Sequence, residues 1–545
     1  MELTRRVLSG EIVLPKFQRS YTWNREQMLK LLDSIARNYP IGSVLLWQSN
    51  ENYVAERTVG DVPVSAPRPG FPMSYILDGQ QRLSTVCGAL HWTPDGNPDS
   101  PWNIVYDLST ESFHHRDSLE NPPVDQIPVR LLSDPGKYFA RTHGLTDSEL
   151  HRRATAFFDR VRDYALPTIT LHGMAKDEVA KVFERINSTG TQLDMVDLVR
   201  AATWKPDFDL SDEIDQLLGV LDEKRYGHVD RKTMLRTISA AAGFGFANQD
   251  MDRLRELSKT ELESAVGSAS EAARRAVDFC TTQIGTPRAA ALPYGNQFAV
   301  LVEIFRQLSK PSSEQFAAIH RWFWLTASGG YFKGWRSNQM AADRDAVTEF
   351  AAGRTSTIDV AASRPQSNLW RRTPFRRDSP TAKVLTLVLS YARPVDLCTG
   401  QYIDTGKALS WTNAKEFHHF FPRDFLTTRQ GYSGDQANAC ANLIMLSSVS
   451  NIWISNQATS GYLKTLCDEQ GEETIRTRLS TCLVGDEAFE AAMRDDYDAF
   501  VQARAKTLHE HLDALIDSGG TAHPVAAPDG TDPDQPEPID RDSAD

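Results

Sequence analysis

The feature that most constrains the fold of this 545-residue chain is an apolar run that contains two adjacent histidines. Residues 416–422 read Glu-Phe-His-His-Phe-Phe-Pro, and the apolar segment 442–446 follows downstream. Neighbouring side chains of a regular strand point to opposite faces, so both histidines can serve one site only at a strand end. The two phenylalanines and Pro422 are expected to bury the base of the following loop and to stop the strand. The two segments therefore predict two short strands with a helix after them.

That helix is expected to begin at Ser450-Asn451 or at Ser455-Asn456, because serine and asparagine favour the N-cap position. Histidines and asparagines from three elements then converge on one place. Such a set suits hydrolysis of a phosphodiester: one imidazole takes a proton from water, while the other imidazole and an asparagine oxygen hold a hydrated divalent cation. The alternative is a buried histidine pair with satisfied hydrogen bonds, and the asparagines in the expected order favour the site.

Residues 416–422 and the asparagines after them resemble the His-Asn-His (HNH, ββα-metal) nuclease domain of GmrSD-type and SspE-type modification-dependent (type IV) restriction proteins. The resemblance implies that His419 is the general base and that His418 and Asn451 hold the cation, Mg²⁺ or another divalent ion. It counts Asn442 with the catalytic residues, as the brace of the loop. The last position of the motif is often histidine, and asparagine here leaves Asn451 and Asn456 as alternative metal ligands.

A second motif lies in the N-terminal third of the chain. Residues 73–77 predict a strand, Asp78-Gly79 a turn, and residues 80–85 the start of a helix. This geometry presents backbone N–H groups to an anion. Arg82 adds a bidentate phosphate donor, and Asp78 is placed to hold a metal or a ribose hydroxyl. Taken alone, glutamine and arginine on a first helical turn more often face solvent.

Segments 14–23 and 182–193, together with the Asp-Gly-Gln-Gln-Arg motif, resemble the ParB-like N-terminal domain of the same restriction proteins. The resemblance implies a site that binds and hydrolyses a nucleoside triphosphate, GTP or ATP. It also implies that the proline-aromatic-Gln-Arg segment lies near a sensor of modified DNA, with phosphorothioate among the modifications. The usual tyrosine of that segment is Phe17 here, which leaves the modification open. The implied nucleotide-site residues are Asp78, Gly79, Gln80, Gln81, Arg82, Arg185, Asn187 and Gly190, with Asp78 and Arg82 also catalytic.

The net charge of −13 does not exclude DNA binding, since local fields decide such contacts more than the sum does. Part of the acidity lies in the proline- and glycine-rich tail after residue 518, which predicts disorder. Elsewhere four arginines flank Trp370 and Phe375, a mixture that is typical of nucleic-acid contacts, although a solvated face is the commoner reason for such a cluster. The residues expected to bind DNA are Pro15, Phe17, Gln18, Arg19, Trp23, Arg371, Arg372, Arg376 and Arg377.

The order of predicted elements indicates an α+β multidomain fold. The expected parts are a ParB-like α/β domain at 1–205, a helical connecting domain at 206–394, a ββα-metal (HNH) domain at 395–517 and a disordered acidic tail at 518–545. No apolar run is long enough to cross a membrane, and we see no signal peptide at the start. The six cysteines show no Cys-x-x-Cys spacing, which favours a reduced cytoplasm over a zinc or disulfide framework.

These inferences predict an anti-phage restriction endonuclease that is regulated by a nucleotide, senses modified DNA, and nicks or cuts it at a one-metal centre. The expected partners are DNA, modified or unmodified, and a nucleotide, with no membrane and with a homodimer left open. Two alternatives remain. One is an NTPase whose C-terminal domain binds nucleic acid without catalysis, and the other is a defence effector that cleaves RNA.

Overall fold

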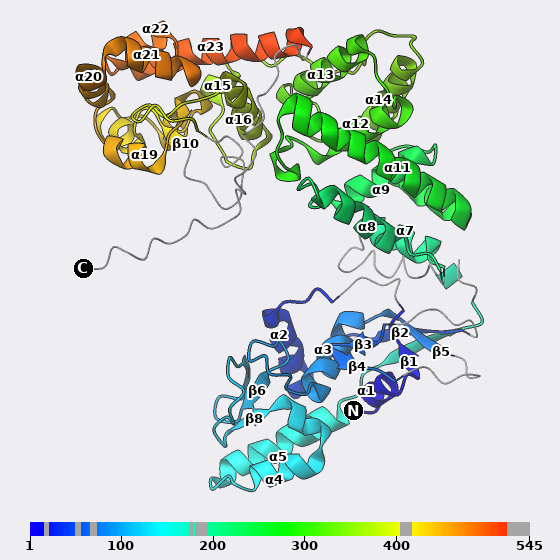
Figure 1. Cartoon of the computed structure of the whole chain (residues 1–545). Helices are drawn as coiled ribbons and strands as arrows, with labels where there is room; N and C mark the ends of the chain where they lie inside the picture. The colour runs from blue at the N-terminus through cyan, green and yellow to red at the C-terminus, as the bar shows by residue number, and fades with distance from the viewer. Residues whose placement is uncertain are drawn as a thin grey trace. The chain divides into compact units, whose positions relative to one another are not determined.

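The chain was analysed as a computed structural model, which describes residues 1–15, 21–49, 56–65, 73–174, 178–179, 182, 195–205, 207–403 and 417–519. It divides into two compact units, Met1–Leu210 and Ser211–Asp545, and each is considered by itself (Figure 1). The fold is mixed α and β, as the sequence predicts. The expected boundary between residues 394 and 395 falls inside the second unit. None of the helices in the described ranges is both long and apolar enough to cross a membrane.

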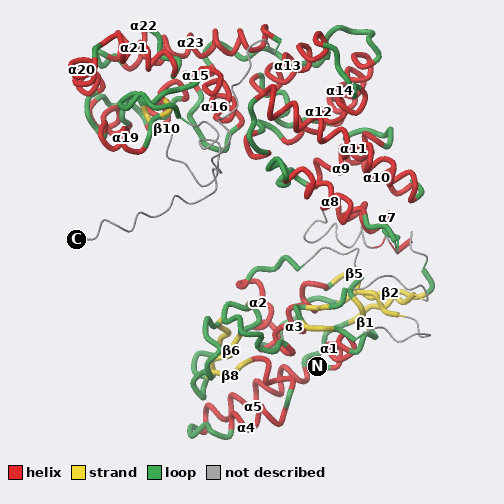
Figure 2. The backbone as a smooth tube through the Cα atoms, in the orientation of Figure 1, coloured by secondary structure: helices red, strands yellow, loops and turns green. Residues whose placement is uncertain are grey.

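A four-stranded sheet organises the first unit, with the strand order β1-β5-β2-β9 (Figure 2). The central strand β5 (Met73–Asp78) is parallel to β1 (Ile12–Val13) and antiparallel to β2 (Val44–Ser49), which is parallel in turn to β9 (Thr168–His172). The alternate residues of β2 and β5 join two separate apolar clusters, so both faces of the sheet are covered.

The remaining elements of this unit pack around the sheet and around a second, smaller sheet with the order β7-β6-β8. A hairpin of β3 and β4 lies between β2 and β5 in the chain. Their bounds are α1 (Glu2–Leu8), α2 (Arg25–Ala36), β3 (Thr58–Val59), β4 (Val62–Pro63), α3 (Gln80–His91), β6 (Ile104–Asp107), β7 (Ser112–His115), β8 (Gln126–Pro128), η1 (Val129–Ser133), α4 (Pro135–Thr142), α5 (Ser148–Asp163) and α7 (Met195–Thr203).

Two local predictions in this unit have different outcomes. The sequence predicts a helix that is capped by Asn24, and α2 begins there. The Asn24 side chain accepts a hydrogen bond from the Gln27 amide, and the Gln27 side-chain oxygen accepts one from the Asn24 amide, a complete capping box. The apolar sequence of residues 127–132 predicts a strand. That prediction is wrong beyond Pro128, where a 3₁₀ turn follows instead. The turn places both Val129 and Leu132 in the core, since positions three apart share one face of a 3₁₀ helix.

The second unit is largely helical, as predicted, up to residue 392. A continuous series of helices packs pairwise, with α12 at the centre against α9, α11 and α14. Their bounds are α8 (Leu210–Asp222), α9 (Arg231–Ala241), α10 (Asn248–Asp252), η2 (Arg253–Glu256), α11 (Lys259–Phe279), η3 (Cys280–Ile284), η4 (Ala289–Ala291), α12 (Gly295–Gln307), α13 (Ser313–Ser328), α14 (Ser337–Ala351), α15 (Leu369–Arg372) and α16 (Pro380–Ala392).

The glycine-rich stretch 328–335 interrupts the helical pattern of the sequence and predicts a connector or a lid, and the structure shows a packed connector. Tyr331 and Trp335 are buried, and both donate hydrogen bonds to the carboxylate of Asp343, at 2.6 and 2.7 Å. Burial raises the pKa of Asp343 to about 6, against the opposing effect of these two bonds. A segment anchored by buried aromatic side chains in this way is not free to open as a lid.

The C-terminal part of this unit combines a two-stranded antiparallel sheet with short and long helices. Helix α23 contacts α13, α15 and α16, so it belongs to the same unit as the helical series. The bounds are β10 (Phe417–His419), η5 (Phe425–Arg429), α18 (Gly434–Ala437), η6 (Cys440–Asn442), β11 (Leu443–Met445), α19 (Ser448–Ile454), α20 (Thr459–Gln470), α21 (Glu472–Thr481), α22 (Asp486–Ala492) and α23 (Tyr497–Ser518).

Candidate functional site

The two histidines lie at the end of β10, and the order strand, strand, helix appears in β10, β11 and α19. His418 is the cross-strand partner of Ile444, and His419 is the partner of Leu443. β10 ends at His419, and Phe420 and Phe421 after it are fully buried. The aromatic pair thus closes the base of the loop that separates the two strands.

Asn442 is buried at 0% exposure and uses its whole amide to hold that loop. Its oxygen accepts a hydrogen bond from the Phe421 amide at 2.9 Å. Its nitrogen donates to the carbonyl oxygens of Phe421, at 3.0 Å, and Ala437, at 2.8 Å. The side chain braces the loop between the strands, and a direct part in catalysis stays a prediction.

A buried arginine on α23 also stabilises this loop through hydrogen bonds to backbone carbonyls. Arg504 donates to the carbonyl oxygen of Ala441 at 2.8 Å and to that of Cys482 at 3.0 Å. Burial at 0% exposure lowers the pKa of its guanidinium to about 10, still far above neutrality. No sequence pattern pointed to this residue, since it lies 62 positions after Asn442 on an otherwise ordinary amphipathic helix.

His419 is half-buried, and its Nε2 lies 3.0 Å from Oδ1 of Asn438. Burial lowers the pKa of this imidazole below its ordinary value; the bond to Asn438 opposes that shift, and the charge of Arg423 adds to it. A neutral imidazole at neutral pH is the form that accepts a proton. His418, one residue earlier on the strand, is also half-buried.

Helix α19 begins at neither of the expected pairs. Its N-cap is Ser447, whose hydroxyl accepts from the Ser450 amide, so the expectation of a start at Ser450 or Ser455 is wrong. The serine nearest to β11 takes the cap because the chain turns directly from that strand into the helix. Asn451 therefore lies inside α19 and is half-buried. Asn456 lies beyond its end, is exposed, and donates to the carboxylate of Asp424 at 3.1 Å.

Asp396 is a further residue of this region that the sequence did not reveal. Its carboxylate is 1% exposed and accepts from the Ser447 amide at 2.7 Å and from the Ser450 hydroxyl at 2.6 Å. Burial alone raises the pKa of a carboxyl, yet these bonds and that from Thr399 hold the pKa of Asp396 below its ordinary value. The charged carboxylate fixes the N-terminal turn of the helix that carries Asn451.

The predicted metal ligands are His418 on β10 and Asn451 on α19. Within the described ranges, no group of three or more His, Cys, Asp or Glu side chains is arranged to hold a metal ion. His418 and Asn451 offer one imidazole nitrogen and one amide oxygen. Mg²⁺ commonly retains several waters and takes few protein ligands. A hydrated divalent cation held by these two residues stays a prediction.

The structure brings the arginine cluster to the candidate site. Pro374 forms an antiparallel bridge with Ala439, and the Phe375 amide donates to the Asn438 carbonyl at 2.7 Å. The ring of Phe375 lies 4.9 Å from that of Phe417 on β10. All four arginines of the cluster, Arg371, Arg372, Arg376 and Arg377, are exposed. The sequence showed only that this segment precedes the histidines, and the backbone pairing is what places it beside them.

In the first unit, the Asp-Gly-Gln-Gln-Arg motif forms the junction between β5 and α3. Gly79 has a φ of +92°, and a Cβ atom there would lie 3.0 Å from Val44, so glycine suits both the turn and the close packing. Gln80 and Gln81 are buried, and the Gln81 side-chain oxygen accepts from the Thr22 and Trp23 amides at 2.8 and 3.2 Å. The glutamine therefore ties Trp23, which is half-buried, to the start of α3.

Arg82 is engaged within the protein in this structure. It donates to the Asp78 carboxylate at 2.8 Å and to the Ile41 carbonyl at 2.8 Å, and its side chain is 18% exposed. A Cβ atom on Gly42 would lie 2.3 Å from this guanidinium, so a glycine makes room for it. The pair stabilises the junction of β5 and α3, and phosphate binding by Arg82 stays a prediction.

The remaining predicted residues lie at or beyond the edges of the described segments. Pro15 is buried at the edge of the described segment 1–15. The others, Phe17, Gln18, Arg19, Arg185, Asn187 and Gly190, lie outside the described residues.

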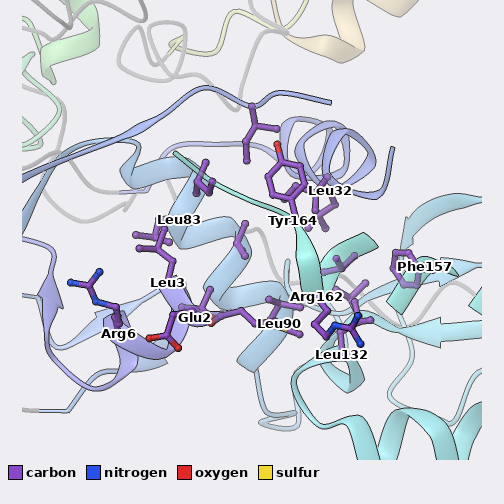
Figure 3. Close-up of a pocket in the computed structure, with 18 of the residues that line it drawn as sticks. Glu2, Leu3, Arg6, Leu32, Leu83, Leu90, Leu132, Phe157, Arg162 and Tyr164 are labelled. Carbon is purple, nitrogen blue, oxygen red and sulfur yellow. The ribbon is translucent and has the colours of Figure 1, made fainter. Parts of the chain in front are cut away.

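A cavity of about 310 Å³ lies in the first unit among α1, α2, α3 and α5 (Figure 3). Its wall is mainly aliphatic and aromatic, with Leu83, Leu90 and Phe157 among the lining residues, and Arg6 and Arg162 belong to the lining too. Neither Asp78 nor Arg82 lines it. The cavity therefore does not correspond to the predicted nucleotide site.

Comparison with known proteins supports the assignment of the first unit. Residues 2–204 match the family model of the N-terminal domain of the GmrSD restriction endonuclease. The chain is also 20% identical to the uncharacterized protein MJ0686 of Methanocaldococcus jannaschii, over 95% of this chain and 98% of that protein. The domain match covers the first unit, and it shows that this unit is similar to the N-terminal domain of a restriction endonuclease.

The brace of the loop gives a prediction about stability. Asn442→Ala removes three buried hydrogen bonds, and each buried group left unsatisfied costs about 1–3 kcal/mol. We expect the free energy of unfolding to fall by about 2–4 kcal/mol in urea denaturation followed by far-UV circular dichroism. The matched control is Asn456→Ala, an exposed amide, which is expected to change stability by less than about 0.5 kcal/mol. Equal stability of the two variants would contradict the bracing role.

Proposed function

We propose that this chain is a metal-dependent DNA endonuclease of a restriction system, with an HNH centre in the second unit and a regulatory nucleotide site in the first. The observation that supports this proposal most is the placement of His418 and His419 at the end of β10, paired with β11 and followed by α19 with Asn451. The N-terminal domain match supports the restriction role independently, because it concerns a different part of the chain.

In the proposed mechanism, His419 accepts the proton of the attacking water. Burial and the nearby charge of Arg423 keep this imidazole neutral, which is the form that the reaction needs. His418 and Asn451 would hold a hydrated divalent cation, which supplies positive charge beside the scissile phosphate and the leaving oxygen. Asn442 and Arg504 hold the loop that follows His419, so the base keeps a fixed position when the DNA is bound.

DNA is proposed to bind across the arginine segment and the exposed face of α19. The arginines at 371–377 supply phosphate contacts, which dominate affinity for DNA. On α19, Val449 and Ile452 are 71% and 75% exposed, and Trp453 is 39% exposed. Exposed apolar side chains suit insertion against bases in a groove. This arrangement explains how a chain with a net charge of −13 still offers a local surface for DNA.

The nucleotide is proposed to bind at the start of α3, where Gly79 opens the helix and the Asp78 carboxylate is partly exposed. A phosphate at this helix start would compete with Asp78 for the guanidinium of Arg82. Exchange of that ion pair would change the β5–α3 junction, to which the segment with Trp23 is tied through Gln81. A nuclease needs such a gate, and the nucleotide state and the modification of the DNA are the proposed signals.

The decisive experiment measures plasmid cleavage with Mg²⁺, with and without GTP or ATP, on modified and unmodified DNA, including phosphorothioate DNA. Chelation of the metal is expected to stop cleavage. Cleavage of RNA in preference to DNA would replace this proposal with an RNA-cleaving effector. DNA binding without metal-dependent nicking would leave a non-catalytic binding domain beside an NTPase.

His419→Ala tests the general base. We expect the rate of nicking to fall by about 10²–10⁴-fold, because a general base contributes that much to the rate, while the affinity for DNA stays within about twofold. The measurement is single-turnover nicking of a supercoiled plasmid together with fluorescence anisotropy of bound DNA. Nicking at the wild-type rate would show that another group takes the proton.

The metal ligand is tested by the matched pair Asn451→Ala and Asn456→Ala. We expect Asn451→Ala to raise the Mg²⁺ concentration needed for half-maximal nicking by about tenfold or more. Loss of a residue that only hydrogen-bonds to a metal ligand already lowers metal affinity by about 10–100-fold, and loss of a ligand itself is expected to cost at least as much. Asn456→Ala is expected to change it by less than about twofold, because its amide is exposed and bound to Asp424. The reverse order would give the ligand role to Asn456.

Arg82→Ala tests the nucleotide site. We expect it to abolish nucleotide hydrolysis and to weaken nucleotide binding in calorimetry, because a phosphate-facing guanidinium is hard to replace. The control is Arg37→Ala, which breaks an i,i+4 ion pair with Asp33 of the same spacing but on an exposed surface of α2. Since Arg82 also braces the β5–α3 junction, thermal unfolding is measured for both variants. A folded Arg82→Ala with unchanged turnover would make the motif purely structural.

A further inference from the structure

The most informative contact of the site that no motif foresaw is the one between His419 and Asn438. The Oδ1 atom of Asn438 lies 3.0 Å from Nε2 of His419. The Nδ2 atom of the same amide donates to the carbonyl oxygen of Phe375 at 2.7 Å. The backbone carbonyl of Asn438 also accepts from the Phe375 amide at 2.7 Å. Asn438 is thus fixed to the arginine segment at two points and touches the proposed base with the rest of its amide.

These contacts determine which nitrogen of the imidazole carries a proton. A carbonyl oxygen only accepts hydrogen bonds, so the nitrogen of the Asn438 amide must face Phe375. The amide oxygen then faces His419, and an amide oxygen also only accepts. Nε2 of His419 must therefore be the donor. In a neutral imidazole one nitrogen donates and the other accepts, so the lone pair resides on Nδ1.

We propose that Asn438 is a positioning residue that holds His419 in the Nε2–H tautomer and thereby assigns Nδ1 as the atom that accepts the proton of water. This inference rests on the proposed nuclease function and adds an element that the HNH motif residues do not supply. Asn438 does not touch the reacting atoms. It acts through the imidazole, and its own orientation is set by Phe375 from a segment 63 residues earlier in the chain.

The same contacts connect substrate binding to the base. Thr373 and Phe375 bind residues 438–440 through backbone hydrogen bonds, and Arg376 and Arg377 follow directly. The Phe375 ring also packs on Phe417, two residues before the base. The segment that orients the Asn438 amide would therefore also bind the phosphates, through these arginines. The scissile DNA strand and His419 would then both be positioned by the same segment, which favours a fixed distance between them.

The first test compares Asn438→Ala with Asn438→Asp in single-turnover nicking at saturating Mg²⁺. We expect Asn438→Ala to lower kcat by about 10–100-fold, within the 10²–10⁴-fold that a base contributes, with KM for DNA within about twofold. Asn438→Asp keeps an acceptor toward Nε2–H and is expected to retain at least about tenfold more activity than the alanine variant. Gln430→Ala is the control, an exposed amide of the same loop that binds the Asp495 carbonyl, and it is expected to match the wild type.

The second test reads the tautomer without cleavage. Long-range ¹H–¹⁵N correlation spectra of the full chain with labelled histidine report which ring nitrogen carries the proton, and His419→Ala identifies the relevant signals. We expect the Nε2–H pattern in the wild type and a mixture in Asn438→Ala. An Nδ1–H pattern in the wild type, or wild-type kcat in Asn438→Ala, would overturn the inference. A wild type that fails to cut DNA would instead remove the nuclease proposal, and the spectra would still decide the tautomer.

Discussion

The second unit depends on one buried amide. Asn442 gives all its hydrogen-bonding capacity to the loop between β10 and β11, at 0% exposure. A buried polar group left without partners is costly, so the loop has few alternatives to the conformation that satisfies it. Arg504 adds a second buried donor to the neighbouring Ala441 carbonyl. Together they hold the loop that follows β10, at whose end the two histidines of the proposed site lie.

Around this brace, the site is assembled from segments that are distant in the chain. Asp396 fixes the first turn of α19, and Asn438 fixes the imidazole of His419. The arginine segment is joined through backbone bonds to the loop that carries Asn438. Each of these contacts is satisfied by polar partners in a partly dry environment, where hydrogen bonds are stronger than in water. The resulting rigidity suits a base and a cation that must keep their places while a charged substrate binds.

Different observations support the proposed roles of the two units. The first matches the N-terminal domain of a restriction endonuclease family over nearly its whole length. The second is described by its own geometry, and its proposed chemistry follows from residue types and contacts. The similarity to MJ0686 covers 95% of this chain, so both units occur together in a second protein. The regulated nuclease that we propose makes use of both, with a signal read in the first unit and the chemistry performed in the second.

The sequence by itself determined the local features of the structure. The N-cap at Asn24, the glycine turn at Gly79 and the succession of β10, β11 and α19 follow from residue preferences over a few positions, and the sequence predicted them. The predicted N-cap of α19 was wrong, since several serines lie in this stretch and Asp396 favours the first, Ser447, by accepting a hydrogen bond from its amide. The tertiary structure alone decided the partners of His419, Ala441 and Ser447, because Asn438, Arg504 and Asp396 reach them through chain folding. No periodicity or motif encodes a contact across tens of residues, and a buried polar group finds its partner only when the core has closed around it.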